Sequence, residues 1–250
     1  MIYPRQFTMP RNSAKLEVCI DTVQGLRACQ TGVDTIELCS ALSVGGLTPS
    51  SGLIAAARES AVPVHAMVRP RAGGFVYSED DILTVLGDLT AVRNAGLAGA
   101  VVGAATPERK LDISALTRIA DEAGDLGLTL HRVIDTLLDP LEAIEQVIDL
   151  GFKRILTSGG QTTAQEGVEQ LRQMHERAAG RIEIVVGSGV NIENVKALAD
   201  ATGARSFHAS CGSEGHADPL NESFGFAPKG MRFTDAAKIA ELRTAIDALE

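Results

Sequence analysis

Short apolar segments of this sequence carry acidic, basic, thiol and imidazole side chains at every second position. A β-strand turns alternate side chains to opposite faces, so residues two apart lie on one face. Segments 16–20, 35–39, 63–69 and 128–131 place on one such face Glu17, Cys19, Glu37, Cys39, His65, Met67, Arg69, Thr129 and His131. The other face carries Val, Ile, Leu and Ala. The pattern predicts an apolar face covered by helices and a polar face turned away from them.

A polar face inside a protein costs several kcal/mol for each charged group unless the group is paired or partly hydrated. One interpretation is a buried ion network, for instance Glu17 or Glu37 with Arg69. The interpretation we favour is a polar pocket that performs chemistry. In it Glu17, Glu37, His65, Arg69 and His131 would be the catalytic candidates, with the two histidines as proton carriers.

Two of the thiols suggest a metal site. Cys19 and Cys39 occupy matching positions in the first two segments, and neighbouring strands lie about 4.8 Å apart. Two thiolates undersupply a closed zinc site but suit Cu(I), with Met67 as a soft third contact. Alternatively, both cysteines are small buried hydrophobic residues, the commonest role of a free cysteine.

Two glycine-rich turns follow later apolar segments. Backbone amides in such turns can bind an anion where a helix begins, and this predicts anion contacts at Ser158, Gly159, Gly160, Gly187 and Gly189, with added charge from Arg71. The alternative is that the tight turns require glycine for their geometry alone.

The elements that position these residues repeat along the whole chain. Apolar segments at 16–20, 35–39, 63–69, 99–102, 128–131, 154–157, 182–186 and 205–208 alternate with amphipathic helices. Alternation predicts a parallel sheet with helices outside. Eight units in 250 residues favour a TIM (β/α)8 barrel over an open doubly wound sheet, and place the functional site at the carboxyl ends of the strands. We expect one barrel domain over residues 15–250, a flexible tail over 1–14 and a polar loop over 211–232 before the last helix.

Composition and charge limit the kinds of molecule that this protein can bind. The net charge of −9 argues against nucleic acid, which needs a basic surface. The sequence has no apolar run long enough for a membrane span and no signal-peptide core at its start. Four cysteines without a secretory signal predict reduced thiols. We therefore expect a cytoplasmic protein with neither membrane nor nucleic-acid partners.

Longer motifs resemble the CutC family, which is associated with copper homeostasis. They are LEVCIDT, DTIELCSALSVGGLTPS, PVHAMVRPRAGGFVYS, LHRVIDTLLDP, GFKRILTSGG and GSGVNIENV, between about residues 16 and 210. The resemblance implies a TIM barrel, a cytosolic location, a homo-oligomer (dimer or tetramer) and a Cu(I) site. The family's proposed copper cysteines fall on Cys19 and Cys39.

Two functions follow from these observations. The first is Cu(I) binding in copper homeostasis through Cys19 and Cys39. The second is an enzyme of unassigned reaction that acts on a small anionic metabolite, phosphorylated or a carboxylate, through glutamate, histidine and arginine at the barrel mouth. A scaffold that only binds a protein partner ranks third, because no long apolar stripe remains beyond what the barrel needs.

Overall fold

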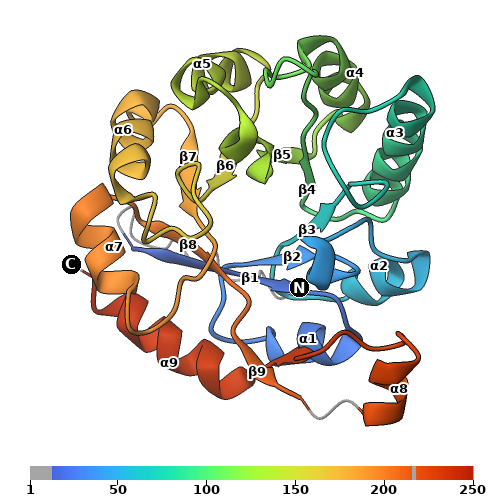
Figure 1. Ribbon diagram of the computed structural model, residues 1–250, viewed down its shortest axis with the longest axis vertical. Helices are drawn as coiled ribbons and strands as arrows, with labels where there is room; N and C mark the ends of the chain where they lie inside the picture. The colour runs from blue at the N-terminus through green and yellow to red at the C-terminus, as the bar shows by residue number, and fades with distance from the viewer. Residues whose placement is uncertain (1–12, 216–217, 250) are drawn as a thin grey trace, which may run out of the picture.

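Eight parallel strands close into a barrel in the computed structural model, which describes residues 13–215 and 218–249. The strands lie in chain order around the ring (Figure 1). They are β1 (Lys15–Ile20), β2 (Thr35–Leu38), β3 (Val64–Met67), β4 (Gly99–Val102), β5 (Gly127–Leu130), β6 (Arg154–Thr157), β7 (Glu183–Val186) and β8 (Ser206–Ala209). β1 pairs with both β2 and β8, which closes the sheet and leaves it no free edge. The predicted TIM barrel is confirmed.

Helices form the outer layer, and local sequence signals mark where they begin. The helices are α1 (Val23–Ala28), α2 (Ser51–Ala57), α3 (Glu79–Asn94), α4 (Ile113–Ala123), α5 (Pro140–Asp149), α6 (Val168–Ala178), α7 (Val195–Thr202) and α9 (Ala236–Asp247). Ser78 caps α3 in a capping box with Asp81, and Asp139 caps α5 ahead of Pro140. None of the helices in the described ranges is both long and apolar enough to cross a bilayer.

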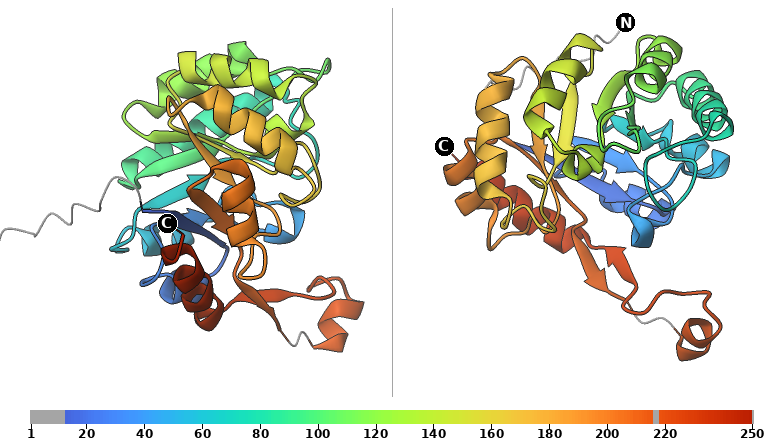
Figure 2. Two further views of the ribbon diagram at one scale, coloured as in Figure 1. Left: turned by 90° about the vertical axis from the view of Figure 1, so that its left-hand side faces the viewer. Right: turned by 45° about the horizontal axis from the view of Figure 1, so that its top comes forward.

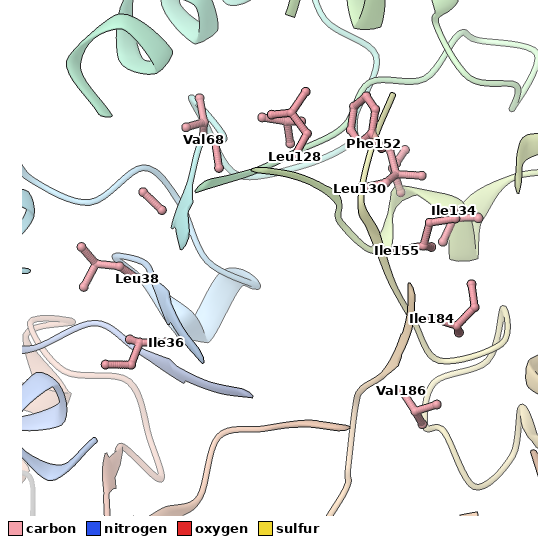
Figure 3. Packing of buried hydrophobic residues seen from close by; sticks show 14 of the residues in the cluster. Ile36, Leu38, Val68, Leu128, Leu130, Ile134, Phe152, Ile155, Ile184 and Val186 are labelled. Atoms are coloured by element: carbon pink, nitrogen blue, oxygen red, sulfur yellow. The ribbon is translucent and has the colours of Figure 1, made fainter. Parts of the chain in front are cut away.

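The main hydrophobic core lies between the strands and this helical layer. Figure 3 shows strand residues such as Ile36, Leu38 and Leu130 directed away from the barrel axis. These residues occupy the apolar set of alternate positions in their segments. The residues at the other alternate positions, of opposite parity, therefore face the barrel interior. Burying apolar area contributes about 25 cal/mol per Å2, and this layer therefore fixes which side chains the interior receives.

The C-terminal segment departs from the expected polar loop over 211–232. It contains β9 (Gly212–Glu214) and β10 (Arg232–Thr234), paired antiparallel, with the short helix α8 (Pro219–Ser223) between them. Figure 2 shows this arm extending from the barrel beside α1. The polar segment expected before the last helix therefore contains regular secondary structure, because its two ends pair as antiparallel strands. The flexible tail predicted for 1–14 lies almost entirely outside the described residues.

Candidate functional site at the barrel mouth

A cavity of about 660 Å3 opens at the carboxyl ends of the strands. Its walls combine strand ends with the loops that follow them. Charged and sulfur-bearing side chains in the lining are Cys19, Glu37, Met67, Arg69, His131, Arg132, Asp135 and His208, and the apolar lining includes Leu42, Phe75 and Leu156. Among the residues expected from sequence at a functional site, Cys19, Glu37, Met67, Arg69, His131, Gly160 and Gly189 line this cavity.

Glu17 and His65 lie elsewhere. Arg154 from β6 reaches across the barrel and donates a hydrogen bond from Nη1 to Oε2 of Glu17 at 2.6 Å and to Nδ1 of His65 at 3.1 Å. His65 and Arg154 line a smaller cavity together with Lys15 and Glu183 near the amino ends of the strands. Neither Glu17 nor His65 lines the mouth cavity. The buried ion network considered from sequence does exist, but its cation is Arg154 and not Arg69.

This network shifts the titration of its members. Burial raises the pKa of Glu17, but the nearby charges of Arg154 and His208 outweigh it and hold that pKa below its usual range. Burial and then the charge of Arg154 lower the pKa of His65. Both effects stabilise a carboxylate and a neutral imidazole, the states that a structural network needs.

At the mouth, Cys19, Glu37 and His208 converge. Each offers one ligand atom, and these atoms lie within 4.8 Å of one another. Nε2 of His208 lies 3.1 Å from Oε2 of Glu37. Burial would lower the pKa of His208, but the charges of Cys19 and Glu37 raise it well above its usual value. The three residues come from β1, β2 and β8, which are neighbours in the closed sheet.

The expected pairing of Cys19 with Cys39 is displaced by two residues. Cys19 lies opposite Glu37 in the β1–β2 register, because the strands of a barrel are staggered relative to one another. Cys39 lies farther along, with its thiol 3.6 Å from Oε2 of Glu37, in a small apolar cluster with Met67 and Val101. Burial, followed by the charge of Glu37, raises the pKa of Cys39 well above normal.

The backbone amides of the glycine turn after β6 bind the carboxylate of a side chain of this protein, Asp135. The carboxylate of Asp135, in the 3-10 helix η2 (Arg132–Thr136), accepts the backbone N–H groups of Ser158 and Gly160 at 3.0–3.1 Å. It also accepts the Thr157 hydroxyl at 2.5 Å and Nε of Arg132 at 2.8 Å. Ser158 and Gly160, two of the predicted anion contacts, thus already donate to Asp135.

The other predicted anion contacts, Gly159, Gly187, Gly189 and Arg71, have three different surroundings. A Cβ on Gly159 would overlap the Gly167 carbonyl oxygen, and one on Gly187 would lie 2.6 Å from Leu156. Close packing therefore explains these two glycines. Arg71 is ion-paired with Asp81 and does not line the cavity. Gly189 remains at the mouth, with Ser188 before it in a positive-φ conformation.

Sequence reasoning missed His208, Arg132, Asp135 and Arg154. His208 had a readable signal, since Ser206 and His208 share a parity opposite to Phe207 in the last apolar segment. Arg154 begins its segment, where a charge normally indicates the solvent-exposed end of a strand. Asp135 carried no readable signal for its role, because the turn amides that it accepts lie more than twenty residues away in the chain; only its ion-pair partner Arg132 is local.

The fold and the site define a closed (β/α)8 barrel whose mouth holds a cysteine, a histidine and a glutamate beside two arginines. The CutC family model matches residues 14–213, and the chain belongs to the CutC family. A CutC family protein of Rhizobium meliloti is 48% identical over 238 residues, covering 93% of this chain and 96% of the relative. One from Caulobacter vibrioides is 41% identical, covering 96% and 100%.

Solved structures agree with this placement. A CutC protein of Streptococcus agalactiae, named for copper homeostasis, superposes with a TM-score of 0.76 at 30% identity, covering 79% of this chain and 98% of that one. Thiamine phosphate pyrophosphorylase from Pyrococcus furiosus has a TM-score of 0.58 at 17% identity, covering 96% and 98%. The second likeness supports the barrel fold alone.

Proposed function

We propose that this protein binds Cu(I) at the barrel mouth through the Cys19 thiolate and the His208 imidazole. The observation that carries the proposal is the convergence of Cys19, His208 and Glu37 within 4.8 Å at the cavity wall. The name of the Streptococcus agalactiae relative, which refers to copper homeostasis, points to the same metal. In this function copper is the cargo of the protein and not a resident cofactor.

The donor set suits a soft cation. Thiolate and imidazole are both good ligands for copper, whereas a carboxylate prefers harder ions. Glu37 contacts Nε2 of His208 and so orients the imidazole ring, as carboxylates beside metal-binding histidines do. Cys39 and Met67 lie next to this group and provide further sulfur for a cation that accepts low coordination numbers.

Anaerobic competition with a calibrated Cu(I) chelator tests the proposal. Cys19→Ala and His208→Gln should each abolish tight binding. Glu37→Gln should weaken it by about 10–100-fold, the usual effect of losing a carboxylate that orients a ligand. Cys29→Ala is the matched control, because Cys29 is buried at the C-terminal cap of α1 and does not line the cavity. Affinity that survives Cys19→Ala and His208→Gln would contradict the site, and Cys39→Ala would then show whether Cys39 holds the metal.

A second candidate function is catalysis on a small anionic metabolite. The cavity of about 660 Å3 is far larger than one ion requires and falls in the range of small-molecule sites, about 300–1,000 Å3. Arg69 and His131 would hold the anion, and Glu37 with His208 would transfer protons. This assignment keeps Glu37, Arg69 and His131 from the residues expected by sequence and leaves out Glu17 and His65, which do not line the cavity.

Thermal-shift measurements with phosphorylated and carboxylated metabolites test this second function. At least one anion should stabilise the protein, and Arg69→Met should reduce that effect. The absence of stabilisation by every compound, with Cu(I) binding intact, would favour the copper function alone.

We also propose that the protein is cytoplasmic and self-associates as a dimer or tetramer, as the family resemblance implies. Leu220, Phe224 and Phe226 on the C-terminal arm are 59–80% exposed and offer an apolar surface for such contacts. Light scattering on the wild type and on Phe224→Ser/Phe226→Ser would measure the oligomer. A monomeric wild type would contradict self-association.

A further inference from the structure

The imidazole of His131 has a fixed orientation and a defined tautomer. Its Nδ1 accepts the backbone N–H of Val133 at 3.1 Å. A nitrogen that accepts a hydrogen bond carries no proton, so the hydrogen of the neutral ring is on Nε2. Burial, followed by the charge of Arg69, lowers the pKa of His131 to about 3. His131 is therefore a neutral donor at physiological pH and not the proton carrier expected from sequence.

The surroundings clamp this ring in the cavity wall. Gly103 leaves room for it, since a Cβ there would lie 2.5 Å from Cε1 of His131. Phe75 packs against the ring with 4.7 Å between centroids. Nε2 of His131 is buried and has no hydrogen-bond partner among the described residues. A buried N–H without a partner is unfavourable, so this donor calls for an acceptor that is not part of the protein.

Arg69 adds a charge that no carboxylate among the described residues neutralises. Its side chain is 5% exposed, and no carboxylate within the described ranges lies within ion-pair distance of it. Nη1 and Nη2 donate to the carbonyl oxygens of Val44, Gly46 and Gly73, while Nε is buried and unpartnered. Carbonyl dipoles satisfy the donors without neutralising the charge, so the guanidinium leaves a positive potential in the cavity wall.

The cavity carboxylates do not neutralise this charge. Asp135 is paired with Arg132 and accepts hydrogen bonds from the backbone amides of the turn after β6. Glu37 is paired with His208. Phe75 joins the two unpartnered groups into one cluster, with the Arg69 guanidinium carbon 5.2 Å from its ring centroid.

We propose that Arg69, Phe75 and His131 form a subsite for a small organic carboxylate. One carboxylate oxygen accepts the Nε2–H of His131, the negative charge lies beside Arg69, and the carbon body packs on Phe75. Two side-chain donors match a planar carboxylate, whereas a phosphate is usually held by several backbone amides, and Asp135 already occupies those after β6. This inference rests on the second candidate function and specifies its substrate class.

Nuclear magnetic resonance of protein labelled with 15N-histidine reads the subsite directly. In the unliganded wild type, His131 should show the neutral Nε2–H tautomer at pH 7. Adding pyruvate or malonate should shift the His131 Nε2–H resonance, and inorganic phosphate should shift it less. The measurement needs no substitution, so it holds even where a variant folds poorly.

Calorimetric titration with the same carboxylates gives the second measurement. Arg69→Met should lower affinity by about tenfold or more, the effect of losing one charge-assisted contact, and His131→Asn should lower it as well. His175→Gln is the control, because His175 lies on α6 and does not line the cavity.

The outcomes separate the subsite from the function on which it rests. Carboxylates that bind without shifting the His131 resonance and tolerate Arg69→Met would overturn the subsite but leave catalysis on an anion standing. Phosphate that binds more tightly than the carboxylates would overturn the substrate class. Failure of every anion to bind would overturn both.

Discussion

Replacing His131 by Asn should make the stability of this protein less sensitive to acid. The buried ring is held neutral, with its pKa lowered from 6.5 to about 3 by burial and by the charge of Arg69. Asn cannot be protonated, but its side-chain oxygen can still accept the Val133 N–H. The two proteins should therefore differ in how their free energy of unfolding depends on pH.

Proton linkage gives the sign and size of the pH-dependent change in the free energy of unfolding. The pKa of His131 is lower in the folded state, so unfolding takes up a proton as pH falls below the unfolded value of 6.5. The free energy of unfolding is therefore highest, as far as His131 is concerned, above pH 6.5. It falls progressively as the pH is lowered to the folded pKa of about 3. At about pH 4.5, two units below the unfolded value, the loss is about 3 kcal/mol, from about 1.36 kcal/mol per unit.

Urea unfolding at about pH 7.5 and about pH 4.5 measures this difference. The carboxylates that also titrate in this range are common to both proteins and cancel in the comparison. His131→Asn should be less stable than the wild type at the higher pH. The gap, meaning the difference in free energy of unfolding between the two proteins, should narrow by about 3 kcal/mol at the lower pH. Leu156→Ala, a cavity-lining change without a titrating group, should keep its gap constant. A gap for His131→Asn that also stays constant would refute the assignment of a buried neutral imidazole.

Three further substitutions test other parts of the structure. Glu17→Gln should cost about 3–5 kcal/mol in urea unfolding, because it removes the closer carboxylate partner of the buried Arg154 charge and leaves only Glu183, 3.9 Å from Nε. Lys196→Ala, in an exposed pair, should change stability by less than about 1 kcal/mol, and equal effects of the two substitutions would contradict the buried network. Asp135→Asn should destabilise by about 1–3 kcal/mol and speed hydrogen exchange of the turn amides it accepts, and unchanged exchange would contradict that role. Gly103→Ala should cost about 1–3 kcal/mol by overpacking against the imidazole ring 2.5 Å away, and wild-type stability would show that the ring is free to move.

The fold was predictable because its signal repeats. Eight apolar segments alternate with helices, and in several of these segments alternation separates Leu, Val and Ile from polar residues. Binary patterning of this kind depends only on neighbours in the chain. It therefore indicated the barrel, the helical layer and the inward direction of Glu37, Arg69 and His131 without any knowledge of tertiary contacts.

Depth within the barrel was not predictable, because parity gives the face of a strand and not the height of a residue along the axis. Glu17 and Glu37 have the same parity on neighbouring strands, yet Glu17 pairs with Arg154 below the mouth and Glu37 lines the cavity. Height depends on the stagger between strands, and only ring closure fixes that stagger. The same stagger places Glu37 rather than Cys39 beside Cys19.

The sequence by itself determined which residue types the interior would receive, since each strand buries its apolar parity against the helices. Tertiary structure alone decided which of these residues meet. His208 reaches Glu37 across the β8–β1 closure, and Asp135 fills a turn that sequence reasoning had reserved for a ligand. The physical reason is that hydrogen bonds and ion pairs act over about 3–4 Å, and contacts at that range between residues far apart in the chain exist only once the barrel has closed.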